Sequence, residues 1–330
     1  MKNTISILAF VTLLLFGSCS SIGYVSFERL EAGDVNYPDD IRRVGVVNNM
    51  PYFSFDNLNR SGFGMASLEG DGTIVADTLA SLLASADYFD EVVICDSILR
   101  GTNTSFAEPY ALSNVLADSL IQAMGVDVLF SLDRIKVDLS VWQEPVGWNT
   151  RFSGRVKSVI TPVMVAYVPG RKTPWFAISY MDSLGYEPYR EMTLGDLRKD
   201  ASTFSAYMLM DHLLPSWKAV ERNYYASGSL EMRDAHVYMN ENNWEGAYKL
   251  WKQVYDKNKK GQKRMKAAFN LAVYHEAHDE TEQAVAYVEE ALKWVKKDSY
   301  DDRMMNIYLL QLNSRIEKRK ALDMQMRRFE

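Results

Sequence analysis

Residues 41–48, Ile-Arg-Arg-Val-Gly-Val-Val-Asn, predict a buried β-strand, because a short β-branched run is bounded by polar residues. A helix is expected next, capped by Asp71 and carrying one apolar stripe at spacings of one, three and four residues. Two more strands, over 91–96 and 126–132, are separated by a second amphipathic stretch. Strands that alternate with helices favour an α/β layer in which helices cover a sheet.

From residue 133 onward, the residue pattern no longer predicts strands that alternate with helices. Apolar and polar residues alternate over 135–141, which is the pattern of a half-buried strand. Residues 152–168 and 175–182 are expected to be further strands joined at a turn, so that an antiparallel meander extends the sheet. A helix is predicted over 194–214, and the Asn-, Gly- and Ser-rich stretch 50–72 is predicted to be a loop.

A helical repeat begins near Leu230, where helix-forming residues replace the β-branched runs. Small and bulky residues stand at fixed offsets from Ala235, and the same offsets recur from Ala272. Because two copies are fewer than the ~3 that a free-standing solenoid needs, flanking helices over 217–226 and 302–328 are expected to cover the ends. The residues of the last helix expected to point inward are Met304, Ile307, Leu310 and Leu312.

Two resemblances follow from these patterns. The amino-terminal domain of TolB resembles this chain in the segments 43–47, 86–89, 91–93 and 123–129, where Gly125 and Asp127 match the step into the central strand. Curli-secretion and penicillin-binding-protein activator lipoproteins are similar over the same region, about residues 41–214. The likeness implies a fold but does not specify a function, because that fold carries assembly, secretion and activator roles.

The repeat resembles tetratricopeptide repeats, in which small residues let two antiparallel helices approach closely. The whole chain looks like a group of Gram-negative lipoproteins known only as a domain of unknown function. We therefore expect an α+β protein: an α/β domain with a mixed sheet covered by helices over 41–225, then an all-α, tetratricopeptide-like domain over 226–330.

The amino terminus predicts a lipoprotein signal peptide over residues 1–18. Lys2 precedes an apolar run over 5–16 that is too short for a permanent membrane span, and small residues stand directly before Cys19. Acylation of Cys19, as by palmitate, would anchor the chain in the cell envelope, and we expect the periplasmic face of the outer membrane. Residues 19–40 are expected to be a tether. The alternative is an ordinary secretory signal with an incidental cysteine.

Composition limits the function classes. The 330 residues are 47% hydrophobic and 24% charged, which is typical of a folded body, and the formal net charge is −6. Residues 226–330 hold 19 Lys and Arg against 17 Asp and Glu, so no strong basic excess predicts nucleic-acid binding. No second apolar stretch approaches the ~18 residues of a membrane helix. Cys95 is expected to be a buried small side chain without a disulfide partner.

No motif for catalysis or for a cofactor is found. The chain lacks G-x-S-x-G, the P-loop and the Rossmann fingerprint. His275 and His278 share a helix face, but their spacing is not that of H-E-x-x-H and packing explains His275, so no metal is expected. Trp148, in a Gly-Trp-Asn loop, is the aromatic residue most expected to be exposed.

The leading hypothesis is a non-enzymatic adaptor or assembly factor. Its helical repeats would hold an envelope protein in a concave groove, with the lipid on Cys19 in the membrane. The residues expected to contact that partner are Tyr238, Asn242, Asn270 and Tyr274. The alternative is a lipoprotein that binds a glycan or small molecule through Trp148.

Overall fold

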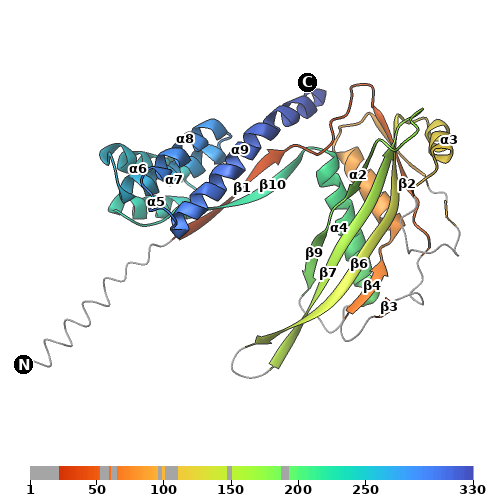
Figure 1. Cartoon of the computed structure of the whole chain (residues 1–330), viewed down its shortest axis with the longest axis horizontal. Coiled ribbons are helices and arrows are strands. Elements are labelled where there is room, and N and C mark those ends of the chain that lie inside the picture. Colours follow the sequence, from red (N-terminus) through yellow and green to blue (C-terminus); the bar gives the residue numbers. More distant parts are fainter. Residues whose placement is uncertain are drawn as a thin grey trace, which may run out of the picture. The chain divides into compact units, whose positions relative to one another are not determined.

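The computed structural model describes residues 22–52, 59–60, 65–95, 99–100, 111–146, 151–186 and 193–329 (Figure 1). The chain divides into two compact units. One, the helical unit, comprises the residues up to Ala32 together with Ser216–Asp323; the other, the sheet unit, comprises Gly33–Pro215 and Met324–Glu330.

In its described segments, the sheet unit holds a mixed sheet and three helices. Its strands are β2 (Arg43–Asn48), β3 (Asn59–Arg60), β4 (Met65–Glu69), β5 (Glu91–Cys95), β6 (Val128–Val146), β7 (Arg151–Tyr167), β8 (Phe176–Ser179) and β9 (Asp182–Tyr186). Its helices are α2 (Gly72–Ser85), α3 (Asn114–Met124) and α4 (Leu194–Leu213).

Strand β6 organises this sheet. On one edge it pairs in parallel with β2, which pairs in parallel with β5, and further along it pairs antiparallel with β4. On its other edge it pairs antiparallel with β7, which carries β8 and β9. The sheet is therefore mixed, as predicted.

Helices cover both faces because side chains alternate along β2. Val44 and Val46 are fully buried in the core that contains α2 and α4. Val47 points to the opposite face and packs in the smaller core that contains α3. Asp71 caps α2 by accepting hydrogen bonds from the amides of Thr73 and Ile74, as the sequence predicts.

Three details of the sheet unit differ from expectation. The predicted strands over 126–132 and 135–141 are one strand, β6, because an irregularity between Leu132 and Arg134 shifts the register without ending the pairing. Strand β4 lies inside the predicted loop 50–72, where it pairs with β6. Strand β9 was also not expected.

The helical unit consists of a two-stranded ribbon and five helices among its described residues. The ribbon is β1 (Ile22–Glu31) with β10 (Ser216–Tyr225). The helices are α5 (Leu230–Asn240), α6 (Trp244–Lys257), α7 (Gln262–Ala277), α8 (Thr281–Leu292) and α9 (Tyr300–Met326).

The ribbon corrects two predictions. Residues 19–40 were expected to be a tether, but Ile22–Glu31 forms β1; residues 217–226 were expected to be a helix, but Ser216–Tyr225 forms β10. The strands pair antiparallel without interruption, from Ile22 opposite Tyr225 to Glu31 opposite Ser216. Strand β10 therefore belongs to the helical unit, whose second segment begins at Ser216.

The repeat positions form the core of the helical unit. Ala235, Ala247, Ala272 and Ala284 are fully buried, and so is Trp251. Small side chains at these sites let the helices pack closely around the indole. The resemblance to tetratricopeptide repeats stays a prediction.

Helix α9 packs through a face that agrees only in part with the predicted one. Leu312 is fully buried and Met304 partly covered, as predicted, but Met305 and Tyr308 are the other buried residues of α9 in this core. Ile307 is 57% exposed and Leu310 is 70% exposed, so both point away from this core.

Among the described residues, no helix is both long enough and apolar enough to cross a lipid bilayer.

Candidate functional site

The ribbon of the helical unit has two free edges. Within the described part of the chain, β1 pairs only with β10 and β10 only with β1. A two-stranded ribbon is marginally stable by itself in water. Its position must therefore be fixed by contacts with the helices.

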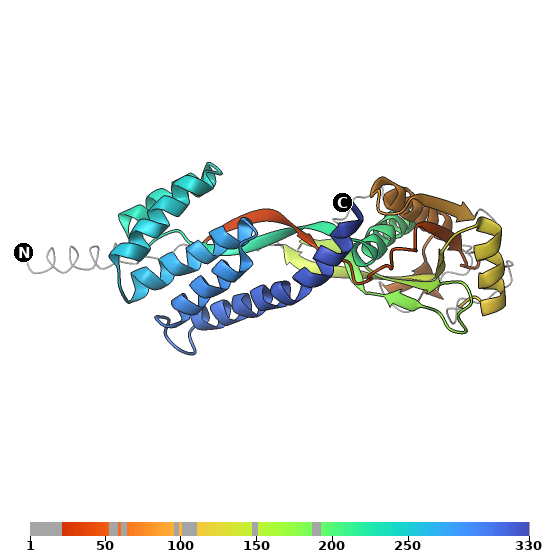
Figure 2. The same cartoon turned by 90° about the horizontal axis from the view of Figure 1, so that it is seen from above.

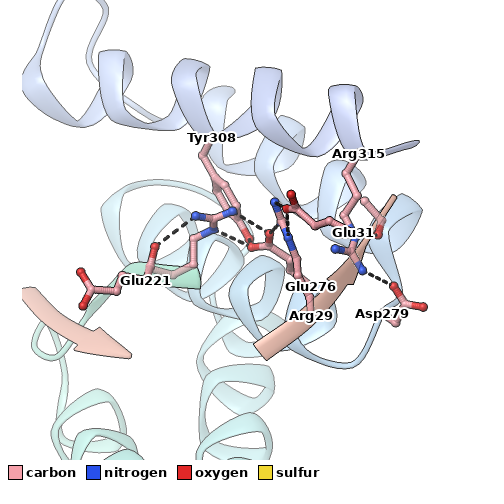
Figure 3. A network of polar contacts seen from close by, with 9 residues as sticks. Arg29, Glu31, Glu221, Glu276, Asp279, Tyr308 and Arg315 are labelled. Carbon is pink, nitrogen blue, oxygen red and sulfur yellow. Dashed lines mark hydrogen bonds and ion pairs between the residues drawn. The ribbon is translucent and has the colours of Figure 1, made fainter. Parts of the chain in front are cut away.

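A buried carboxylate makes these contacts (Figure 3). Glu276 of α7 has a fully buried side chain. One of its oxygens lies 2.6 Å from Nη1 of Arg29 on β1 and 2.7 Å from Nη2 of Arg222 on β10. The other lies 2.7 Å from Nε of Arg222 and accepts a 2.7 Å bond from the hydroxyl of Tyr308 on α9. Four elements thus meet at one carboxylate.

The electrostatics of this anchor are balanced. Burial opposes the charge of Arg222, but its bonds to Glu276 outweigh this and raise the pKa of Arg222. Burial and the neighbouring carboxylate raise the pKa of Tyr308 well above its ordinary value, so the phenol stays a donor. Arg29 also binds Glu31, at 2.5 Å. We call Arg29, Arg222, Glu276 and Tyr308 the anchor.

A groove of about 750 Å³ lies beside the anchor, between the ribbon and α9. Figures 1 and 2 show α9 running alongside β1 and β10. One wall is formed by residues 29–32 and 218–222 of the ribbon region. The other wall is a single stripe of α9 at spacings of three and four: Ile307, Leu310, Gln311, Ser314, Arg315, Lys318, Arg319, Leu322 and Asp323.

The α9 wall is apolar at one end and basic at the other. Ile307 and Leu310 are the exposed apolar residues. Arg315 is 2.5 Å from Asp279; Arg319 is 3.2 Å from Glu282 and 3.7 Å from Asp279. Lys318 has no carboxylate within ion-pair distance among the described residues. Such a wall suits a ligand that carries both apolar groups and negative charge.

A second polar cluster lies in the sheet unit, where the parallel part of the sheet ends. Asp133 is nearly fully buried and accepts 2.7 Å bonds from Asn49 and from Ser131. Burial raises the pKa of Asp133. Ser131 belongs to the same strand as Asp133, β6, whereas Asn49 directly follows the neighbouring strand β2, so this carboxyl links β6 to the end of β2.

Two of the predicted partner contacts are on the surface. Tyr238 is 37% exposed and packs against the backbone of Gly246. Asn242 is exposed in the turn between α5 and α6, in the left-handed region with φ 54°, and its side chain accepts a bond from the indole of Trp244.

The other two are internal, which corrects the prediction. Asn270 is fully buried: its amide oxygen accepts from the Tyr225 N–H at 2.7 Å, and its amide nitrogen donates to the Tyr225 carbonyl at 2.9 Å. Tyr274 is 8% exposed; it stacks on His278 and its hydroxyl donates to Glu245 at 2.5 Å. Their polar groups are used within the fold.

The remaining predicted sites are placed as follows. Cys19 and Trp148 lie outside the described residues, so the lipid anchor and the aromatic ligand site stay predictions. His275 is buried with Nδ1 2.5 Å from Glu280, and Nδ1 of His278 is 2.7 Å from the carbonyl of Tyr274. Among the described residues, no group of three or more His, Cys, Asp or Glu side chains is arranged to hold a metal ion.

Sequence reasoning missed the groove and its anchor. Arg29 lay in the supposed tether, and Ile307 and Leu310 were expected inside. A signal was present in the spacing of 307, 310, 314, 318 and 322, which places these residues on one stripe of a helix.

Comparison with known families adds two matches. A domain of unknown function, DUF8603, matches residues 41–225, and a second domain of unknown function, DUF6340, matches residues 233–314. No curated protein matches the chain.

Proposed function

This chain belongs to the DUF8603 domain family, and we propose from its own residues that it is a lipid-anchored, non-enzymatic adaptor of the cell envelope. A partner protein is held in the groove between the ribbon and α9. The observation that carries this proposal is the α9 wall, where a 27-residue helix leaves Ile307 and Leu310 exposed beside a cavity of about 750 Å³.

Exposed apolar side chains that border a groove are typical of protein-binding surfaces. An isolated exposed leucine is common. Here two neighbouring apolar residues stand one turn apart and share a wall with basic side chains, which is the mixture found at interfaces that select one partner.

The anchoring part of the proposal rests on the sequence. Cys19 directly follows an apolar run with a basic start, so the acyl chain would be attached three residues before β1 begins at Ile22. The helical unit would then be held close to the membrane, and we propose the periplasmic face of the outer membrane as its location.

Site-specific photocrosslinking in intact cells tests the adaptor. A photoreactive amino acid at position 310 is expected to give one discrete adduct, because Leu310 faces the partner in the groove. The matched control is position 237: Val237 is 52% exposed on α5, away from the groove, and should give none. Equal adducts at both positions, or none at 310, would refute the adaptor.

The Cys19→Ala form, analysed alongside, tests the attachment of the chain to the membrane by a lipid separately. It is expected to leave the membrane fraction, whereas Cys95→Ala is expected to stay there. If Cys19→Ala remains in the membrane fraction, a lipid on Cys19 is not what holds the chain at the membrane, whatever the crosslinking shows.

A further inference from the structure

We propose that the occupant of the groove is an extended, acidic segment of the partner protein, which pairs with the free edge of β10 as a third strand. This inference rests on the proposed function and names the chemistry of the partner. It follows from which backbone groups of β10 face outward, and from the side chains of α9 opposite them.

The outward positions of β10 are given by Tyr225. Both its N–H and its C=O are bonded to Asn270, so they point away from β1. In an antiparallel pair, outward and inward positions alternate. The ribbon has uninterrupted register, so residues of the same parity as Tyr225 also direct their backbone groups outward: Trp217, Ala219, Glu221 and Asn223.

Ala219 and Glu221 bring this edge into the groove. Both line it, and the Glu221 carbonyl already accepts a 3.0 Å bond from the guanidinium of Arg222, which confirms that it faces outward. An exposed row of N–H and C=O groups is a template for another strand.

Asn270 defines where the added strand must stop. Its amide donates to and accepts from Tyr225 as a neighbouring strand would, and it comes from α7, which therefore closes that end of the edge. The anchor closes the same end from the side of α9, through Tyr308 and Arg222. The edge is open toward Ala219, where the groove continues to Leu322.

The α9 wall selects the side chains of the added strand. From residue 314 onward, the wall carries Arg315, Lys318 and Arg319 against the single acid Asp323. Arg315 and Arg319 share Asp279, and Arg319 also pairs with Glu282 at 3.2 Å, so Lys318 is the cation at this end that has no carboxylate partner among the described residues. A carboxylate on an incoming segment would pair with Lys318, and apolar side chains would cover Ile307 and Leu310.

The dimensions agree with a short segment. The α9 stripe from Ile307 to Leu322 spans about 22 Å at ~1.5 Å per residue. At ~3.3 Å per residue, a strand of about seven residues has the same length.

Binding of defined peptides to the full chain tests the inference. The probes are a fluorescent peptide of about eight residues that alternates Val and Glu, its Val–Lys counterpart, and the Val–Glu peptide N-methylated at alternate residues. Fluorescence anisotropy should detect binding of the first alone, because the second has the wrong charge and the third lacks the backbone donors. The affinity should fall as salt is raised.

Two variants locate the contact. Ala219→Pro removes an outward N–H and should weaken binding of the Val–Glu peptide about tenfold, whereas Ala219→Val keeps the N–H and should not. Lys318→Glu should weaken binding about tenfold, and Lys297→Glu, a charge reversal at an exposed site off the groove, should have no effect. Equal unfolding midpoints of Ala219→Pro and Ala219→Val exclude a folding defect.

Amide hydrogen exchange of the unaltered chain gives a readout that needs no variant. Adding the Val–Glu peptide should slow exchange at Ala219 and Glu221 and leave Lys218 and Val220, which already face β1, unchanged. Absence of Val–Glu binding, equal binding of the Val–Lys peptide, or unaltered exchange at Ala219 and Glu221 would overturn the inference. The adaptor would still stand if the adduct at position 310 forms.

Discussion

Glu276→Gln is expected to lower the free energy of unfolding of the helical unit by about 3–5 kcal/mol. The buried carboxylate is the counter-charge of Arg29 and Arg222, whose side chains are only 15% and 13% exposed. The amide has nearly the same shape but no charge, so the guanidinium of Arg222 would lose its counter-charge and that of Arg29 would keep only Glu31. Urea denaturation followed by far-ultraviolet circular dichroism measures the change.

Glu289→Gln is the matched control, because Glu289 is exposed on the neighbouring helix α8. It should change stability by less than about 0.5 kcal/mol. A triple variant, Arg29→Met with Arg222→Met and Glu276→Leu, removes the three buried charges together, leaves the partly exposed Glu31, and should recover most of the loss. If Glu276→Gln costs no more than its control, the anchor does not hold the ribbon.

Asn270→Ala is expected to destabilise the helical unit by about 3 kcal/mol, because the buried N–H and C=O of Tyr225 each lose their partner. Asn270→Asp should restore only part of this, since a carboxylate accepts from the Tyr225 N–H but cannot donate to its carbonyl. Thermal and urea unfolding of the three forms give the comparison.

Asn313→Ala serves as the control for this series, since Asn313 is exposed on α9. Its stability should stay within about 0.5 kcal/mol of the parent. A similarly small effect of Asn270→Ala would mean that water replaces the amide at Tyr225, and the end of the β10 edge would then not be closed.

Most of the sheet unit could be predicted from the sequence because its signals are local. The β-branched run in β2, the capping of α2 by Asp71 and the left-handed Gly125 at the end of α3 each act within one element. The prediction failed where the formation of a strand depends on pairing with a segment that is distant in the sequence. Strand β4 is five residues long and is specified by its pairing with β6.

The ribbon could not be predicted, because its two strands are far apart in the sequence. Residues 22–31 and 216–225 form their register across the whole sheet unit. The alternation of apolar and polar side chains along these strands was also obscured. Arg29 and Arg222 are charged, yet their side chains point into the helical unit and pair with Glu276, whereas the aromatic Trp217 is 67% exposed. A charged inward residue and an exposed aromatic one conceal the period-2 signal.

The face of α9 was assigned correctly for Leu312 and wrongly for Ile307 and Leu310, for a related reason. Apolar residues occur on nearly every side of the helix between Met304 and Leu312, so periodicity cannot select the buried face. Met305, Tyr308 and Leu312 fill the core, and the apolar residues left over line the groove. Asn270 was misjudged because a polar helical residue was taken to face water, whereas the Tyr225 backbone satisfies it.

The central claim is that a partner is held at the ribbon and α9 rather than on the face of α5 that carries Tyr238 and Asn242. The most direct test compares Leu310→Asp with Tyr238→Asp, which place the same charge at two exposed positions. After crosslinking in cells, recovery of the partner should be lost with Leu310→Asp and kept with Tyr238→Asp, at equal protein levels and unfolding midpoints. Loss with Tyr238→Asp and retention with Leu310→Asp would contradict the account and return the site to the helical hairpins.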